Sequence, residues 1–299
     1  MNKDELIAWI ALPFIVLLGF LLAWAGSDGG KAYASLPVFF WCAIVSFGIQ
    51  WLAFIPAFFK QTEKFYDLTG SLTYLTSLGL ALYLSGDFDF SSLLLSLLIT
   101  LWAVRLGSFL FLRIQAVGED SRFREIKKSF PRFLVAWSLQ GLWVIFSMAA
   151  AWAAITTQSK ATPNLLTGMG ILIWLIGFGI EVIADQQKSN FRKSPENAAQ
   201  FIQSGLWAWS RHPNYFGEIL LWVGIALIAL PQLRGWQVLT LVSPLFITLL
   251  LTRISGIPLL EAKSDLKWSG QADYEHYKAT TPALILRPPA RKYINKDPE

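Results

Sequence analysis

Residues Ser210 to Leu230 read SRHPNYFGEILLWVGIALIAL, a polar segment followed directly by an uncharged apolar run. Pro213 cannot continue a helix from its N-terminal side but is tolerated in a first turn, so we expect a helix to begin around it. The stretch therefore predicts a membrane span whose first turn carries polar groups. These groups form either an interfacial anchor or one wall of a binding site: Arg211, His212, Asn214 and Glu218.

The composition of the whole chain indicates a membrane protein. Of its 299 residues, 54% are hydrophobic and 15% are charged, and the mean hydropathy is +0.47. A soluble domain carries about 25% charged residues, whereas several uncharged runs here approach the ~20 residues that cross a ~30 Å hydrocarbon core. We therefore predict an all-α fold, a polytopic transmembrane helical bundle. The lone Cys42 cannot form an intrachain disulfide, so the redox compartment is not indicated.

The apolar runs predict about seven or eight spans within a single integral membrane domain, residues 1–299. The third run is short and could instead be re-entrant. The first run lacks the basic leader and the cleavage site of a signal peptide, so we expect it to be retained. A polar cytoplasmic tail is expected over residues 262–299. The predicted spans are Leu6–Ala25, Ser35–Phe59, Leu68–Leu84, Ser91–Leu112, Phe133–Ala154, Leu165–Ile183, Tyr215–Leu230 and Trp236–Leu251.

The distribution of Lys and Arg predicts the orientation of these spans. Of the 25 basic residues, 21 fall in the N-terminus, the C-terminal tail and three alternate loops, whereas three fall in the opposite loops. Basic residues favour the cytoplasmic side, so both termini and the three basic loops are expected there. Topology thus accounts for the net charge of +5, and we expect no nucleic-acid partner. The architecture favours a bacterial inner membrane.

Charged residues follow one face of the helix that extends from the predicted sixth span. Glu181, Asp185, Lys188 and Arg192 are separated by four, three and four residues, which places them on one helical face. One interpretation is an ordinary helix end with long basic side chains reaching the interface. However, Glu181 lies inside the apolar run ILIWLIGFGIEVIA, where an unpartnered carboxylate costs about 3 kcal/mol. This cost favours a functional role for the face.

Arg105 interrupts the apolar run SLLITLWAVRLGSFLFL about two turns before Arg113. It either reaches the interface from there or faces the bundle interior, where a guanidinium can bind a carboxylate or a phosphate with two hydrogen bonds. In the opening motif, Asn214 lies at a predicted helix N-terminus and Glu218 lies one turn further on. The amides and the dipole at such a terminus favour a bound anion.

The joint pattern of two segments resembles a known family. GLWAWSRHPNYFGE (205–218) follows IADQQKSNFRK (183–193), and together they resemble the C-terminal half of the steroid 5α-reductase-like membrane proteins. The resemblance is strongest to bacterial relatives catalogued as a domain of unknown function, and RHPNYxGE is also similar to membrane sterol reductases. It covers residues 181–289 well, and RLGSFLFLRIQAVGEDSRF and KFYDLTGS more weakly.

This resemblance implies a helical bundle whose cytoplasmic half binds NADPH, beside a lateral cavity for an apolar enone drawn from the membrane lipids. The reaction would be reduction of the carbon–carbon double bond by hydride transfer, with the enone either steroid-like or another lipid. No GxGxxG motif follows a strand, so a Rossmann fold is not expected. The implied cofactor-binding residues are Arg105, Arg113, Arg122, Asp185, Lys188, Arg192, Arg211, Asn214, Glu218 and Arg253.

The catalytic group is less well matched. In the family, the pair that polarises the carbonyl resembles a Gln-Glu in an early helix together with a Tyr, whereas this chain has Gln61 and Glu63, which are not adjacent, and Tyr66. We predict Glu63 or Tyr66 as the proton donor. Alternatively, KFYDLTG is a loop in which Asp67 caps the third span. The His-rich tail of the family is replaced here by RISGIPLLE (253–261).

Two other classes remain open. Membrane methyltransferases of the isoprenylcysteine and phospholipid type carry a RHPxYxGE-like segment in an S-adenosylmethionine site. The Asp185–Arg192 helix and the surplus of Arg favour a phosphorylated cofactor over S-adenosylmethionine, which has no phosphate. A non-enzymatic membrane binder or transporter is disfavoured because the polar groups gather at one cytoplasmic face and not at the bilayer midplane. The sequence does not indicate the physiological substrate or the oligomeric state.

Overall fold

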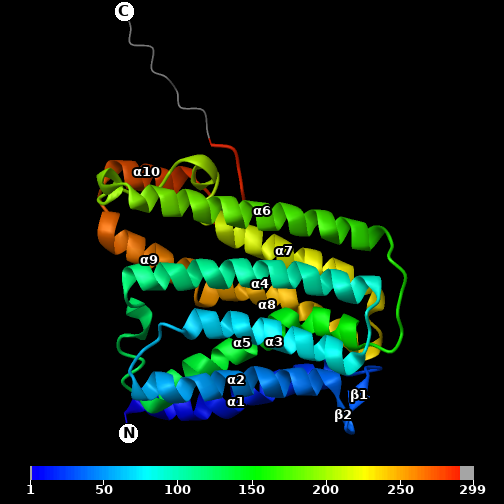
Figure 1. Ribbon diagram of the computed structural model, residues 1–299. Helices are drawn as coiled ribbons and strands as arrows, with labels where there is room; N and C mark the ends of the chain where they lie inside the picture. Colours follow the sequence, from blue (N-terminus) through cyan, green and yellow to red (C-terminus); the bar gives the residue numbers. More distant parts are fainter. Residues whose placement is uncertain (1, 290–299) are drawn as a thin grey trace, which may run out of the picture. The chain divides into compact units, whose positions relative to one another are not determined.

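The computed structural model describes residues 2–289, and helices dominate this part of the chain (Figure 1). The chain divides into two compact units. Unit 1 comprises residues 1–171 and 225–246, and unit 2 comprises residues 172–224 and 247–299. Within residues 2–289, seven helices are long and apolar enough to cross a membrane. The prediction of a polytopic helical membrane bundle is therefore confirmed.

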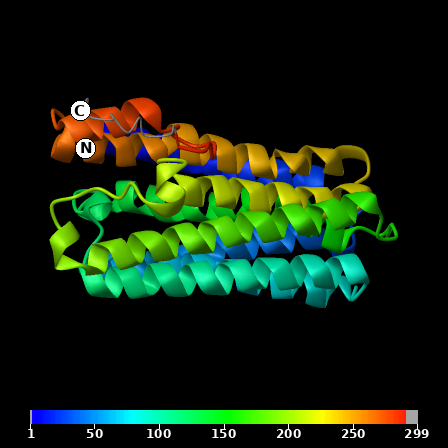
Figure 2. The same cartoon turned by 90° about the horizontal axis from the view of Figure 1, so that it is seen from above.

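Unit 1 is built from helices that run alongside one another, as Figures 1 and 2 show. A short antiparallel hairpin, β1 (Ala32–Tyr33) and β2 (Leu36–Pro37), joins the first two helices. The end of α7 (Pro213–Ala229), two 3-10 helices at Leu230–Gln232 and Gly235–Leu241, and the start of α8 (Val242–Leu249) complete the unit. Its main helices are α1 (Lys3–Gly26), α2 (Val38–Phe59), α3 (Tyr66–Ser85), α4 (Phe90–Val117) and α5 (Phe130–Thr156).

Helix α5 is the core of unit 1 because its residues are apolar on every side. It packs against α1, α2 and α3, and small residues let these helices approach closely. Gly141 of α5 and Gly19 of α1 both lie against the Phe47 ring, where a methyl group would come within 3.0 Å of it. The fully buried large side chains of α5 are Phe133, Trp137, Ile145, Met148, Trp152 and Ile155.

Helix α3 corresponds to the short predicted span Leu68–Leu84, but it is not among the seven helices that meet the length and hydropathy criteria. The reason is its hydroxyl content. Thr69, Thr73 and Ser77 each donate a hydrogen bond to the carbonyl four residues earlier, at 2.8, 2.7 and 2.6 Å. Such bonds satisfy polar side chains inside an apolar bundle at little cost. The helix is therefore buried without being strongly apolar.

Unit 2 contains the polar motifs and their supporting helices. Helix α6 (Leu165–Lys193) extends beyond the predicted span end at Ile183, as the helical spacing of the charged residues up to Arg192 predicts. Helices α9 (Ile257–Trp268) and α10 (Ala272–Thr280) occupy much of the predicted polar tail. The predicted last span ends at Leu251, whereas the structure passes through a π-helical turn, Leu250–Ile254, before α9. Pro258 in the first turn of α9 favours this restart, because proline is tolerated there.

Two glycines bring the backbones of α6 and α7 together within unit 2. A methyl group at Gly217 would lie 2.6 Å from the carbonyl oxygen of Gly177 and 2.7 Å from the backbone nitrogen of Glu181. A methyl group at Gly177 would lie 2.6 Å from the carbonyl oxygen of Gly217. No larger residue fits either position without a backbone shift. This contact positions the polar side chains of the two helices next to one another.

Candidate functional site

The segment GLWAWS is attached to α6 at the turn that carries the predicted cofactor residues. The Trp207 indole Nε1 donates to the carbonyl of Ala184 at 3.0 Å, and the Leu206 amide donates to Gln187 Oε1 at 2.9 Å. The Lys188 ammonium lies 4.2 Å from the centre of the Trp207 ring, a favourable cation–π distance. The contact joins residues 205–209 directly to residues 183–193 of α6. These are the two segments whose joint pattern resembles the family.

Asp185 and Asn214 meet across the same contact. The Asn214 amide nitrogen donates to Asp185 Oδ1 at 3.1 Å, which joins the C-terminal third of α6 to the first turn of α7. Both residues were predicted to bind the cofactor from separate motifs. The structure therefore brings together two of the predicted residues that are 29 positions apart.

Each of the two helices carries one more carboxylate, about one turn away from this contact. Glu181 precedes Asp185 by four residues and Glu218 follows Asn214 by four residues, so each is displaced by about one helical turn. Glu181, Asp185 and Glu218 are 2%, 6% and 7% exposed. Ionised carboxylates are this deeply buried only where other groups compensate their charge. The α6–α7 contact thus carries three buried acidic side chains. Lys188 lies about one turn after Asp185 on α6.

Arg211 connects the start of α7 to α9 and α10. Its Nε donates to Glu261 Oε1 at 3.1 Å, and its Nη1 donates to the carbonyl oxygens of Lys278 and Thr281. The carbonyls at a helix C-terminus attract a cation, because they lack partners within the helix. These bonds use the Nε and Nη1 donors of the Arg211 guanidinium. Arg211 was predicted to bind the cofactor, and that role stays a prediction.

His212 shares Glu261 with Arg211. The His212 Nε2 lies 2.8 Å from Glu261 Oε1, the ring is stacked on Tyr215 with 5.7 Å between centres, and the side chain is buried. Burial lowers the pKa of His212 below its ordinary value, an effect that the bond to Glu261 opposes only in part. Among residues 2–289, no group forms a hydrogen bond with the other ring nitrogen, Nδ1. Glu261 comes from the segment that replaces the His-rich tail.

The remaining predicted cofactor residues are distributed over both units. Arg192 is exposed in the last turn of α6, and Arg253 is exposed in the π-helical turn, so both belong to unit 2. In unit 1, the Arg105 guanidinium lies 5.3 Å from the Phe109 ring centre. The other two pair with acids: Arg113 with Asp67 at 3.9 Å, and Arg122 with Asp120 at 2.6 Å.

The two predicted catalytic residues are engaged by their own unit. Glu63 is 4% exposed, and its two oxygens accept from the Asp120 amide at 2.9 Å and from Lys127 Nζ at 2.8 Å. The Tyr66 hydroxyl donates to the carbonyl of Ala136 at 2.8 Å, and its ring packs against Trp137. These contacts hold the loop before α5 in place. Whether either residue donates a proton stays a prediction.

The alternative assignment of Asp67 as a helix cap is wrong. Helix α3 begins at Tyr66, earlier than the predicted Leu68, and Phe65 at its N-cap position makes no side-chain capping bond. Asp67 therefore lies inside the first turn, where a carboxylate is favoured by the helix dipole. It also faces Arg113.

A buried polar cluster in unit 1 was missed by the sequence analysis. The Gln50 amide nitrogen donates to Thr73 Oγ1 at 2.8 Å, and the Tyr74 hydroxyl lies 2.6 Å from Ser147 Oγ. All four side chains are buried. Among the described residues, Gln50 Oε1 has no hydrogen-bond partner. The available signal was an amide, Gln50, within the apolar run GIQWLAF.

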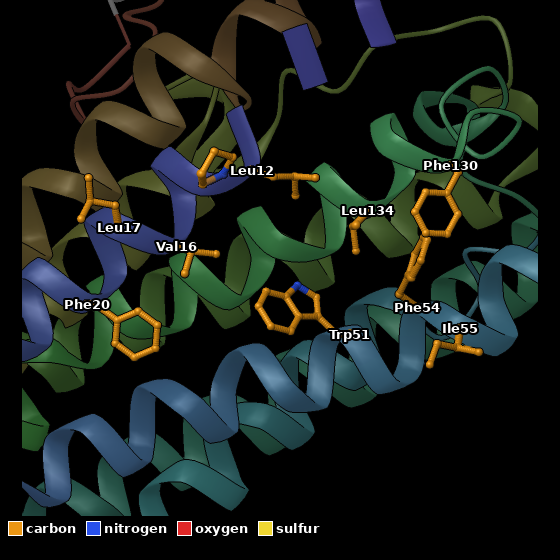
Figure 3. Close-up of a pocket in the computed structure, with 10 residues that line it drawn as sticks. Leu12, Val16, Leu17, Phe20, Trp51, Phe54, Ile55, Phe130 and Leu134 are labelled. Atoms are coloured by element: carbon orange, nitrogen blue, oxygen red, sulfur yellow. The ribbon is translucent and has the colours of Figure 1, made fainter. Parts of the chain in front are cut away.

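Unit 1 also contains an open apolar cavity of about 730 Å³ between α1, α2 and α5, with exposed residues such as Leu17 and Ile55 in its lining (Figure 3). Figure 3 shows Val16 and Phe20 of α1, Trp51 of α2 and Leu134 of α5 around it. The Trp51 indole nitrogen is bonded to Ser138 Oγ at 2.9 Å, so the ring presents hydrocarbon. All of its lining residues are hydrophobic: Leu12, Pro13, Val16, Leu17, Phe20, Trp51, Phe54, Ile55, Phe130 and Leu134. Such a lining suits an apolar molecule of drug size.

Comparisons with known proteins identify relatives of the chain. The family model described as "Protein of unknown function (DUF1295)" matches residues 53–281. The 3-oxo-5-alpha-steroid 4-dehydrogenase 1 of Rattus norvegicus is 29% identical over 167 residues, which cover 54% of this chain and 58% of that protein. The protein of the same name from Bos taurus is 36% identical over 74 residues, which cover 25% of this chain and 28% of that protein.

A human relative with a slightly different name, type 2 in place of type 1, is also similar. The 3-oxo-5-alpha-steroid 4-dehydrogenase 2 of Homo sapiens is 33% identical over 59 residues, which cover 20% of this chain and 23% of that protein. In these three comparisons, the chain spans between about a quarter and somewhat more than half of the relative's length. No solved structure matches the chain significantly. In residues 2–289, no group of three or more His, Cys, Asp or Glu side chains is arranged to hold a metal ion.

Proposed function

The chain belongs to the DUF1295 family, and we propose that it is an NADPH-dependent membrane oxidoreductase that reduces the carbon–carbon double bond of an apolar enone. The predicted resemblance to steroid 5α-reductase-like proteins is confirmed by the match to this family and by the similarity to the steroid dehydrogenases. The names of these relatives specify 3-oxo steroids. For this chain, we propose the wider class of apolar enones, steroid-like or of another lipid type.

The observation that carries the proposal is the contact between Asp185 and Asn214 in unit 2. It joins the two motifs that the resemblance assigns to the cofactor. A dinucleotide needs acceptors for its ribose hydroxyls and carboxamide, and cations for its phosphates. Unit 2 offers both kinds of group: buried carboxylates on α6 and α7, and the basic residues Lys188 and Arg192. The residues present therefore fit such a cofactor.

The expected roles come from the resemblance to the family, and this chemistry agrees with them. Asp185, Asn214 and Glu218 would hold the ribose and the nicotinamide side, and Arg192 would meet the additional phosphate of NADPH. When bound, the cofactor would supply a hydride to the substrate. The protein would bind and orient both molecules, keep water out of the site and provide the proton. By the resemblance, Arg105, Arg113, Arg122 and Arg253 would be phosphate or adenosine-side contacts.

The substrate would enter an apolar environment, and the cavity of unit 1 provides one (Figure 3). The group that polarises its carbonyl oxygen has two sets of candidates. Glu63 and Tyr66 follow from the sequence, but their polar atoms are committed to Lys127, Asp120 and Ala136. The cluster of Gln50 and Tyr74 offers an amide and a phenol in a dry setting, so we include it in the proposal.

Thermal stability of the detergent-solubilised protein tests the cofactor directly. NADPH should raise the melting temperature and S-adenosylmethionine should not, because a ligand that binds the folded state stabilises it. The opposite result would favour the methyltransferase and overturn the proposed function. Arg192→Ala should weaken the binding of NADPH more than that of NADH, since NADH lacks the phosphate that Arg192 is expected to meet. Equal losses would remove that role from Arg192.

Turnover of an enone panel tests the proton donor. Steroid and non-steroid enones are offered to the wild-type protein and to the matched variants Tyr66→Phe and Tyr74→Phe. Each variant removes one hydroxyl and keeps the ring. A turnover loss of about 100-fold is expected for the true donor, the usual size of general acid catalysis, with NADPH binding unchanged. If both variants retain full turnover, neither tyrosine donates the proton.

A further inference from the structure

The start of α7 contains one side chain whose hydrogen bonding is incomplete. In the sequence, His212 lies between Arg211 and Asn214. Arg211 is bonded to α9 and α10, and Asn214 is bonded to Asp185 of the predicted cofactor site. Its imidazole is 5% exposed, and within residues 2–289 its Nδ1 has no hydrogen-bond partner. A buried nitrogen without a partner costs free energy, so its presence requires an explanation.

The contact with Glu261 determines what Nδ1 can do. Glu261 Oε1 already accepts a bond from Arg211, and an ionised carboxylate can only accept hydrogen bonds. The 2.8 Å contact therefore requires His212 Nε2 to carry the proton. In the neutral ring, the second nitrogen then carries a lone pair. Glu261 thus fixes His212 in the tautomer whose Nδ1 is an acceptor.

The surroundings of His212 indicate the chemistry of the missing donor. Arg211 and Lys188 both act on the ring with positive charge, and these charges disfavour a metal cation as the partner of Nδ1. A ligand that bonds to Nδ1 would bring an O–H or N–H group. A nucleotide has both, in its ribose hydroxyls and its carboxamide, and its phosphates suit the positive charge nearby.

We propose that His212 is a cofactor-binding residue whose Nδ1 accepts a hydrogen bond from a hydroxyl or amide group of the bound NADPH, with Glu261 holding the ring in the required tautomer. This inference rests on the proposed function, because it takes the cofactor to bind in unit 2. Glu261 is then a positioning residue that acts through His212. The pairing also gives the segment 253–261 a role in the site, although that segment lacks histidine.

Two substitutions separate the two nitrogens. In His212→Gln, the side-chain nitrogen can take the place of Nε2 and keep the bond to Glu261, but the Nδ1 acceptor is lost. In His212→Asn, the side-chain oxygen can take the place of Nδ1, but the bond to Glu261 is lost. A residue that is merely structural would be sensitive to the second change alone.

The experiment measures the dissociation constant for NADPH by tryptophan fluorescence in detergent, and the melting temperature without cofactor. H212Q should raise the dissociation constant by about tenfold, the effect of one lost hydrogen bond, and should keep a melting temperature near that of the wild type. H212N should bind NADPH more tightly than H212Q but melt at a lower temperature. This reversal of order is the specific signature of an acceptor at Nδ1.

The outcomes distinguish the two levels of the proposal. If wild-type protein binds NADPH and H212Q binds it equally well, His212 does not contact the cofactor and this inference is overturned. If the wild-type protein does not bind NADPH, the proposed function fails and this inference fails with it. If H212Q cannot be isolated folded, H212N is compared with H212A. Equal dissociation constants for that pair would likewise overturn the inference.

Discussion

Glu63 of unit 1 and His212 of unit 2 are both buried beside basic residues, and they differ in how their hydrogen bonds are completed. Both oxygens of Glu63 are bonded within the unit, to Lys127 and to the Asp120 amide. His212 has one nitrogen on Glu261 and the other without a partner among residues 2–289. Both carboxylate oxygens of Glu63 are therefore occupied by groups of unit 1, whereas the Nδ1 atom of His212 can still form a hydrogen bond with a ligand.

This difference separates structural polar groups from candidates for ligand binding more sharply than burial does. Burying a polar group costs free energy unless a hydrogen bond replaces the lost water. Where the chain itself supplies the bond, the group stabilises the fold. Where it does not, a ligand can supply the bond on binding. By this criterion, the polar atoms of Glu63 and Tyr66 are bonded within unit 1, whereas His212 Nδ1 is the acceptor that we propose for a ligand.

The largest effect is expected at the backbone contact of unit 2. Gly217→Val places a side chain within 2.7 Å of backbone atoms of α6, so it should lower the free energy of unfolding by about 4 kcal/mol and abolish NADPH binding. Unfolding in mixed detergent micelles measures the first quantity. Gly179→Ala is the matched control, because nothing lies within 4 Å of that position. A tolerated valine at 217 would show that this contact does not support the site.

Lys127→Met tests how much the buried ion pair between Lys127 and Glu63 stabilises unit 1. It leaves the Glu63 carboxylate buried without its cation, which should cost about 3 kcal/mol of the free energy of unfolding. Adding Glu63→Gln should recover part of that loss, because a neutral amide needs no cation. Denaturation curves of the two variants measure the difference. NADPH affinity should stay unchanged in both folded variants, and a selective loss of turnover in the double variant would instead assign Glu63 to catalysis.

Tyr66→Phe should have a smaller effect. It removes the hydroxyl that donates to Ala136 at 2.8 Å, and one such bond contributes about 1 kcal/mol. The ring contacts with Phe123 and Trp137 remain. The melting temperature should fall slightly. Turnover per folded molecule then separates the two roles: it stays at the wild-type level if Tyr66 is structural, and it falls by about 100-fold if Tyr66 is the proton donor. A large fall in turnover at unchanged stability would contradict the structural role of Tyr66.

The smallest effect is the pH dependence contributed by His212. Because its folded pKa is lowered, the unfolded state binds the proton more readily. The stability that His212 contributes is therefore complete above about pH 6.5, its unfolded pKa, and is lost as the pH falls below it. Glu261, Arg211 and Lys188 are the charged groups that act on the ring. Melting temperatures between pH 8 and 5 should fall less steeply in H212Q than in the wild type, and parallel curves would contradict this.

Much of the fold followed from local features of the sequence. Hydropathy and length predicted the helical bundle, because any apolar run of about 20 residues that enters a bilayer must satisfy its backbone as a helix. Helix boundaries were predicted less well. The extension of α6 beyond Ile183 followed from the helical spacing of the charged residues between Glu181 and Arg192. The π-helical turn before α9 did not follow, because hydropathy does not reveal it.

The site was predicted in part. The spacing of Asp185 and the RHPNY motif led to the pair that the structure joins, Asp185 with Asn214. Glu63 and Tyr66 were chosen because they resemble the Glu and the Tyr that the family uses to polarise the carbonyl, yet their hydrogen-bond partners Lys127 and Ala136 lie 64 and 70 positions away in the chain. Gln50 was overlooked because a single amide in an apolar run carries little weight without its neighbours.

The sequence by itself determined the class of protein, the helical periodicity of the charged face and the motifs that relate the chain to its family. These are properties of residue type and of short spacing, and they persist whatever the chain packs against. Only the tertiary structure decided which polar groups are satisfied. Glu261 lies 49 positions from His212, and their contact alone makes Nδ1 an acceptor. Hydrogen-bond completion depends on distant partners, so it cannot be read from local sequence.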